Sequence, residues 1–359
     1  MRPAFSSTRQ AAAFALLLQV VLLLPFAMQK SWLPSRQEIY NFQGWGGGPY
    51  PWLRNQIFEE TNDIDIAFVG SSHIINGINP LLVQTELTKK IGRPAVVRTL
   101  AWGGPGYDGL YLIAKDLLEH RKVRLLVFYD EKVAATRNPA TITLFRFSDN
   151  SSDLVGLPLP DQGLYYGSAL FGMPRNLLGL VRRSLPVVLS PHPDLASENN
   201  SSRFPAHLGA DAVPPAPNSP DTLQKFLAAQ NPRVSVYSTN VGGDFEISRT
   251  ALPVWQAHFA KKFAALCQSH DCKLVLLDIP ILAEAQSPVI HERAAWPDLL
   301  QADVAMIGVP PKKLFAGLTE NEIRGLFWND FHFNRNGMEH FTSVITPALL
   351  QLYETATEP

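Results

Sequence analysis

The residues of this chain best suited to chemistry are two adjacent serines, Ser71 and Ser72, and a distant histidine, His332. A serine hydroxyl attacks an acyl group only when a histidine removes its proton, and that histidine needs an acid to fix its tautomer and steady its charged form. The oxyanion that develops needs backbone N–H donors, which glycines expose closely. These residue types predict a serine nucleophile site for acyl transfer or ester hydrolysis.

The candidate residues follow short apolar runs that read as buried strands. Ser71 and Ser72 come after such a run, and His332 lies with Asp330 in a loop near the C-terminus. Ligands bind at the carboxyl ends of the strands in open parallel sheets, so we expect the strand-end residues to meet there. Besides the two serines and the Asp330/His332 loop, they are Gly103, Gly104, Asp130 and Asp278.

Strands and helices alternate from residue 63 onward. The strands are predicted over 65–69, 95–100, 123–129 and 274–277, and the helices over 80–91, 110–120, 253–269, 297–307 and 337–354. This alternation predicts an α/β three-layer sandwich with a mostly parallel sheet. The predicted domain covers 61–355, with a Pro-rich insertion at about 149–222 that is partly unstructured around a helical piece at 171–183.

Composition excludes several classes of protein. The 359 residues carry 31 basic and 32 acidic side chains, a net charge of −1, so no global field would hold a nucleic acid. Two cysteines exclude a disulfide-dense scaffold and a four-thiolate zinc site. His291-Glu292 lacks the second histidine of a zinc-protease motif, so we expect no metal and no cofactor.

The N-terminus reads as a membrane-targeting segment. Arg2 and Arg9 precede an uncharged apolar stretch, Ala11–Met28, close to the length that crosses a bilayer. We expect residues 1–30 to be a cytoplasmic tail and transmembrane signal anchor rather than a cleaved signal peptide, because no small-residue cleavage site is evident. The basic leader then stays in the cytoplasm, and the domain lies on the periplasmic or extracellular side.

Residues 31–60 read as a linker rich in Gly, Pro and aromatic residues. Two alternatives remain open here: Trp45, Tyr50 and Trp52 sit at the membrane interface or pack on the domain. Cys267 and Cys272 either form a disulfide in an oxidising compartment or are two thiols near a helix end.

Three blocks resemble the SGNH (GDSL-like) hydrolases. Phe68-Val69-Gly70-Ser71-Ser72 is similar to the first block, Leu100-Ala101-Trp102-Gly103-Gly104 to the second, and His332 with Asn334 and Gly337 to the last. The resemblance implies that Ser72 is the nucleophile and His332 the base. It also implies that the backbone amides of Ser72 and Gly104 are the oxyanion donors. His73, which follows directly, reads as a structural residue that points away from Ser72.

The chain departs from the family pattern in two places. The family's third block supplies an oxyanion Asn, whereas this strand ends Phe128-Tyr129-Asp130-Glu131. The acid of the last block should lie three residues before His332, where Asn329 stands, while Asp330 lies two before. We therefore predict that Asp330 serves as the acid; the alternatives are that Asp278 or Asp130 substitutes, or that the site is a Ser–His dyad.

The anchor and the sequences Gly70-Ser71-Ser72 and Gly77-Ile78-Asn79-Pro80 resemble a membrane-anchored subgroup. It includes the alginate O-acetylation and D-alanyl teichoic acid transfer proteins, which work beside membrane-bound O-acyltransferases. The resemblance implies a serine-dependent O-acyltransferase or esterase acting on a cell-envelope polysaccharide. The alternatives are a non-catalytic SGNH-like partner of a membrane-bound O-acyltransferase and a glycan-binding envelope protein.

Overall fold

The structure is a computed structural model that describes residues 5–27, 35–40, 50–101, 106–129, 144–145, 147–167, 235–237, 247–249, 253–292 and 304–356. Its centre is a sheet in the order β2-β1-β3-β6-β8-β4. The first five of these strands run parallel, and the short β4 pairs antiparallel with β8 at the edge. The strands of the sheet are β1 (Ile64–Gly70), β2 (Val97–Ala101), β3 (Val123–Tyr129), β4 (Ser235–Tyr237), β6 (Lys273–Leu277) and β8 (Ala305–Gly308).

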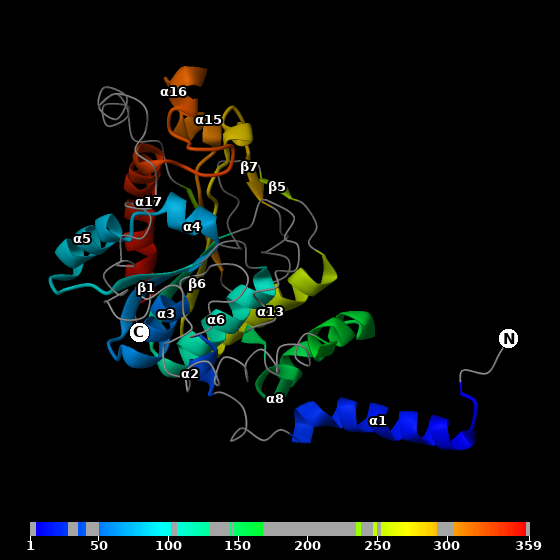
Figure 1. The fold of residues 1–359 in the computed structure, drawn as a ribbon. Coiled ribbons are helices and arrows are strands. Elements are labelled where there is room, and N and C mark those ends of the chain that lie inside the picture. The colour runs from blue at the N-terminus through cyan, green and yellow to red at the C-terminus, as the bar shows by residue number, and fades with distance from the viewer. Residues whose placement is uncertain are drawn as a thin grey trace, which may run out of the picture.

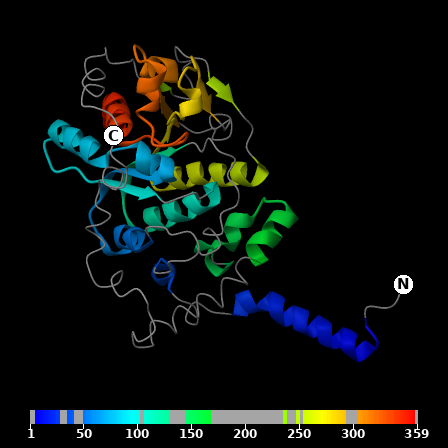
Figure 2. The ribbon, with the colours of Figure 1, turned by 45° about the horizontal axis from the view of Figure 1, so that its top comes forward.

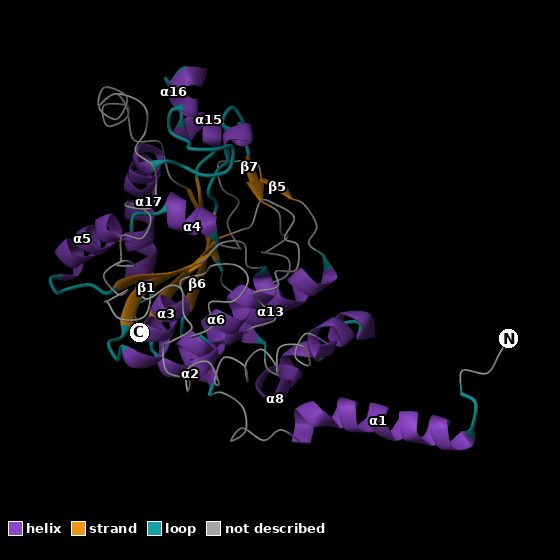
Figure 3. Cartoon of the chain, in the orientation of Figure 1, coloured by secondary structure: helices purple, strands orange, loops and turns teal. Residues whose placement is uncertain are grey.

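Helices cover both faces of this sheet (Figures 1 and 3). Those on one face are α3 (Tyr50–Arg54), α6 (Tyr107–His120) and α13 (Val254–Ser269) with the π-helical turn η2 (Asn55–Glu59). Those on the other are α4 (Ser72–Gly77), α5 (Pro80–Ile91), α15 (Pro311–Leu314), α16 (Glu320–Arg324) and α17 (Arg335–Thr355). The predicted α/β fold with a largely parallel sheet is confirmed at this level.

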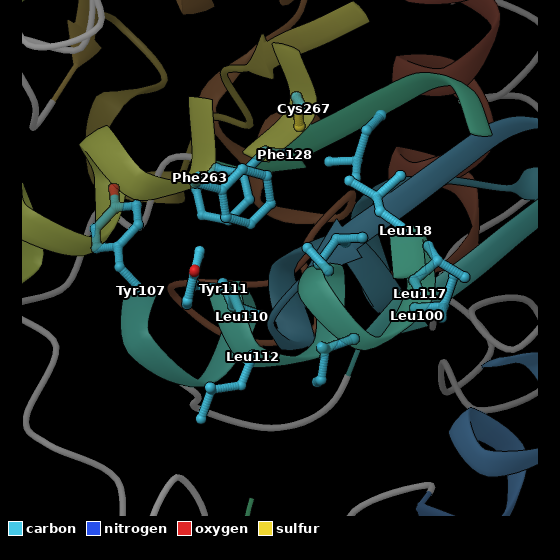
Figure 4. Packing of buried hydrophobic residues seen from close by; sticks show 14 of the residues in the cluster. Leu100, Tyr107, Leu110, Tyr111, Leu112, Leu117, Leu118, Phe128, Phe263 and Cys267 are labelled. Atoms are coloured by element: carbon cyan, nitrogen blue, oxygen red, sulfur yellow. The ribbon is translucent and has the colours of Figure 1, made fainter. Parts of the chain in front are cut away.

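Alternation along the strands explains the two layers. On β3, Leu126 and Phe128 face the cluster under α6 and α13, whereas Leu125 and Val127 face the cluster under α5 and α17. Every residue of β1 is buried, as expected for a central strand with helices on both sides. Figure 4 shows the first cluster, where side chains of α6 and α13 close over the sheet, and Figure 2 shows these two helices lying side by side.

Polar contacts tie the C-terminal helix to the first strand. Asp65 of β1 accepts bonds from Tyr353 Oη of α17 at 2.5 Å and from Arg93 Nη2 at 2.5 Å. Burial alone would raise the pKa of Asp65, but the bonds from Arg93, Tyr353 and the Val96 amide outweigh it and lower that pKa. The Asn79 amide also donates to Thr342 Oγ1 at 2.9 Å. Two segments about 260 residues apart in sequence are therefore held together.

Several expectations change in the described residues. Residues 31–60 are not a simple linker, because Ile39 and Tyr40 of the segment around α2 (Arg36–Ile39) are fully buried in the core. Trp52 packs on the domain, where its indole N–H donates to Thr99 O at 3.0 Å. The predicted helix 297–307 is strand β8 over its last residues, and the rest of it lies outside the described residues.

The insertion predicted at 149–222 is described only at its start. There α8 (Phe147–Asn150), the 3-10 turn η3 (Ser151–Leu154) and a helix over 159–167 pack on the core through Leu154, Leu157 and Tyr165. The helical piece at 171–183 lies outside the described residues. A small separate sheet pairs β5 (Ile247–Arg249) with β7 (Ile290–Glu292), and the short turn η5 (Leu282–Glu284) follows β6.

The N-terminal segment forms α1 (Thr8–Ala27), which lies apart from the sheet in Figure 1. Among the described residues, no helix is both long and apolar enough to cross a membrane, so the expected transmembrane anchor is not found. Cys267 and Cys272 are both buried free thiols. Hydrogen bonding to Cys272, together with burial, raises the pKa of the Cys267 thiol.

Candidate active site

The first part of the site is the turn from β1 into α4. Ser71 is the N-cap of α4, and its hydroxyl accepts the His73 amide at 3.3 Å. A side chain on Gly70 would overlap Ile74, so glycine permits the helix to start directly against the strand. Ser71 is buried while Ser72 is partly exposed, so Ser72 is the more accessible of the two serines.

The second part is the loop between α16 and α17. An antiparallel bridge between Phe327 and Phe333 closes it, and the Trp328 amide donates to His332 O at 3.1 Å. Asn334 then caps α17: its side-chain oxygen accepts the Asn336 and Gly337 amides at 3.0 and 3.2 Å, and its Nδ2 donates to Gly325 O at 2.6 Å. These bonds place His332 next to the start of a long helix that packs on β3 and β8.

Gly337 is the point where this loop is most sensitive to a substitution. A Cβ at Gly337 would overlap the Leu326 carbonyl oxygen, a backbone atom that cannot rotate away. We expect Gly337→Ala to lower the free energy of unfolding by about 1–3 kcal/mol, because the loop or the helix must shift. Gly163→Ala is the matched control: a Cβ there meets open space within a helix, so the change should be neutral or slightly stabilising. Urea denaturation of both variants measures the difference, and equal stability would contradict the close approach at Gly337.

The structure brings Ser72 and His332 together. The Ser72 hydroxyl oxygen lies 2.8 Å from His332 Nε2, although 260 residues separate the two in sequence. This is the hydrogen-bond distance that a serine nucleophile and its histidine base require. The Asn76 side chain donates to Ser72 O at 2.7 Å and so holds the first turn of α4 in place.

The other ring nitrogen of His332 is bound by Asn329, not by Asp330. Asn329 Oδ1 lies 3.0 Å from His332 Nδ1 and also accepts the backbone amides of Phe331 at 2.8 Å and His332 at 2.9 Å. Two amide donors identify the facing atom as the oxygen, so Nδ1 carries the proton and Nε2 is free to accept one. The prediction of Asp330 as the acid is corrected: Asn329, three residues before the histidine, takes that position.

His73 forms part of the site, contrary to the expectation that it points away. Its ring stacks on His332 with centroids 4.8 Å apart, and on Tyr129 at the same distance. The indole of Trp328 also packs on the His332 ring, with ring centroids 5.4 Å apart. The His332 imidazole is therefore held by ring contacts as well as by Asn329. No sequence motif that we used relates the position of His73 to that of His332.

The surroundings of His332 favour the neutral form of its ring. Burial lowers the pKa of His332, and no carboxylate contributes a compensating rise. A neutral imidazole is the form that can accept the serine proton. Because the folded-state pKa lies below the unfolded value, the unfolded chain binds more protons and stability falls as the pH drops through the histidine range.

The neutral Asn329 side chain at Nδ1 of His332 leads to a testable prediction. Asn329→Asp keeps the three accepted hydrogen bonds and adds a negative charge next to the ring, so the pKa of His332 should rise by about one unit or more. An NMR titration of the His332 ring protons measures it. Asn329→Ala, which adds no charge, is the control. An unchanged pKa in the Asp variant would mean that the two side chains are not in contact.

The remaining predicted residues are placed as follows. Gly103, Gly104 and Asp130 lie outside the described residues. Asp278 is buried at the end of β6, where its amide donates to Ile307 O at 2.9 Å. The Ser72 amide has no intrahelical acceptor, because Ser72 is the first residue of α4. Within the described residues, no cluster of three His, Cys, Asp or Glu side chains could hold a metal.

Comparison with known proteins leaves this geometry as the main guide to function. No protein-family model matches the chain, and no curated protein sequence matches it.

Proposed function

We propose that this protein is a serine-dependent O-acyltransferase or esterase that acts on a cell-envelope polysaccharide, of the SGNH (GDSL-like) type. The 2.8 Å contact between the Ser72 hydroxyl and His332 Nε2 carries the proposal. The position of the pair supports it too. The chain passes from β1 to β2 on one side and then crosses to β3 on the other side of β1, so the direction of winding reverses here, and ligands of doubly wound sheets bind at such a switch point.

The chemistry follows from the hydrogen bonds. His332 Nε2 takes the proton of Ser72 as the hydroxyl oxygen attacks the acyl carbonyl carbon, and the Ser72 amide faces the oxyanion. The protonated imidazole then returns its proton to the departing alcohol, which leaves an acyl-Ser72 ester. A sugar hydroxyl or water gives its proton to His332 and attacks the carbonyl carbon of that ester. The bond between the acyl group and the Ser72 oxygen then breaks, His332 returns the proton to that oxygen, and the acyl group leaves on the sugar or on water.

Asn329 has a specific part in this scheme. It holds the Nδ1 proton and so keeps Nε2 ready to accept, but as a neutral amide it stabilises the imidazolium less than a carboxylate would. That neutral partner is the one observation that favours the second candidate, a non-catalytic SGNH-like partner of a membrane-bound O-acyltransferase. The extracytoplasmic location and the membrane as a partner are proposed from the sequence of residues 1–30 alone.

Labelling with a serine-directed fluorophosphonate tests the proposal. The native chain should react in a time-dependent manner, and peptide mass spectrometry should locate the adduct on Ser72 rather than Ser71. Reaction should slow as the pH falls and His332 becomes protonated. Absence of any adduct on the folded chain would favour the non-catalytic candidate, and an adduct elsewhere would remove Ser72 as the nucleophile.

A further inference from the structure

The loop that carries His332 displays a second set of side chains that the proposed acyl chemistry does not use. Trp328 is 48% exposed and Phe331 is 43% exposed, and Asp330 between them is exposed as well. All three lie inside the loop closed by the Phe327–Phe333 bridge. They therefore share a rigid support with His332.

The aromatic residues of this loop divide into two groups. Phe327 and Phe333 are buried and pack on each other with ring centroids 4.6 Å apart. Trp328 and Phe331 are apolar like Phe327 and Phe333, but their side chains are exposed to solvent. Trp328 is exposed while its ring packs on the candidate base, and covering an exposed apolar side chain at the edge of a site with a ligand is favourable.

Trp328 lies close to the proposed reacting groups, Ser72 and His332. Its ring centroid lies 5.4 Å from that of His332, the residue whose Nε2 faces Ser72. Whatever covers the exposed part of the indole is therefore next to the acyl-accepting atoms. A residue outside the loop also holds it in place, because the Leu282 amide donates to Asp330 O at 3.0 Å.

The chemistry of the three side chains selects the ligand. A flat aromatic ring packs against the C–H face of a sugar ring, and the indole N–H adds a polar edge. A carboxylate accepts hydrogen bonds from hydroxyl groups. Among the described residues, no cation is paired with the Asp330 side chain, so its oxygens are open to solvent and ligand. A polyhydroxylated ring with an apolar face satisfies all three groups.

We propose that Trp328, Asp330 and Phe331 form a sugar-binding subsite that holds one ring of the polysaccharide beside Ser72. This inference rests on the proposed function and names the part of the site that recognises its substrate. It also gives Asp330 a role: accepting substrate hydroxyl groups rather than supporting His332.

Two esters separate sugar binding from acyl chemistry. The full chain is assayed with p-nitrophenyl acetate, which has no sugar, and with an acetylated xylan oligosaccharide. In Trp328→Ala, the ratio of kcat/KM for the oligosaccharide to that for p-nitrophenyl acetate should fall by about tenfold, mainly through KM. Trp328→Phe should recover part of that ratio, and Phe331→Ala and Asp330→Asn should lower it. Leu81→Ala, an exposed apolar residue on α5, is the matched control and should change neither ester.

Two results would overturn the subsite. An equal loss with both esters would mean that Trp328 only positions His332, and an unchanged ratio in all three variants would mean that the loop does not contact sugar. A loss of acylation in cells without any change in the ratio would indicate that a protein partner covers the loop, and it would also overturn the proposal.

Direct binding keeps the subsite separate from the acyl chemistry. If the native chain hydrolyses neither ester, the proposed function fails, and the subsite is tested in the Ser72→Ala chain by titration with the xylan oligosaccharide. The tryptophan fluorescence should change on titration, and the change should be lost when Trp328 is also replaced by Phe. A signal that does not depend on Trp328, or no signal, would count against the subsite.

Discussion

Replacing Ser72 with alanine is expected to lower kcat for ester hydrolysis by about 10⁴-fold or more and to abolish fluorophosphonate labelling. In the proposed mechanism the Ser72 hydroxyl oxygen becomes acylated, and without it only substrate binding and the oxyanion donors remain. The variant should fold normally, because Ser72 is partly exposed and its hydroxyl hydrogen-bonds to the side chain of His332. Burst-phase kinetics with p-nitrophenyl acetate measure the loss.

Ser71→Ala is the control for this experiment. Ser71 caps α4 through a bond from the His73 amide, so its loss should cost about 1 kcal/mol of stability. Activity per folded molecule should stay close to that of the native chain, since the Ser71 hydroxyl is buried. The reverse pattern, with Ser71→Ala inactive and Ser72→Ala active, would assign the nucleophile to Ser71.

Replacing His332 with alanine is expected to lower kcat by about 10³–10⁴-fold, because Ser72 then has no group to accept its proton. The hydrogen bond from Ser72 to His332 Nε2 is the interaction removed, and the cavity left beside His73 and Trp328 has the shape of the missing ring. Added imidazole should therefore restore part of the activity of His332→Ala. Its rate should rise with the concentration of neutral imidazole.

His73→Phe separates the two stacked histidines. Phenylalanine keeps a ring between Tyr129 and His332 but cannot take a proton, so this variant should lose far less activity than His332→Ala. If His73→Phe were as inactive as His332→Ala, His73 would be the base and the assignment of His332 would be wrong. Circular dichroism of both variants checks that the fold is retained.

Much of the fold could be predicted from the sequence because its signals are local. The helix over 80–91 begins at a proline and ends before a glycine, and α5 has these same bounds, with Gly92 in the left-handed conformation. The strand over 123–129 is apolar apart from the exposed Arg124 and is observed as β3. One helix prediction failed: residues 305–307, predicted as the end of a helix over 297–307, pair with β6 as a strand, because pairing depends on a partner that lies elsewhere in the sequence.

The sequence by itself determined which residues could do the chemistry: a serine after a strand, and a histidine before a capping asparagine and a close-packed glycine. These are properties of short segments, and each can be recognised from a few consecutive residues. Only the tertiary structure decided how they combine. It placed Asn329 rather than Asp330 on His332, because the loop turns so that the Asn329 oxygen faces two backbone amides and the ring together. It also stacked His73 on His332. This contact depends on the packing of α4 against the loop before α17, so no single segment of the sequence could predict it.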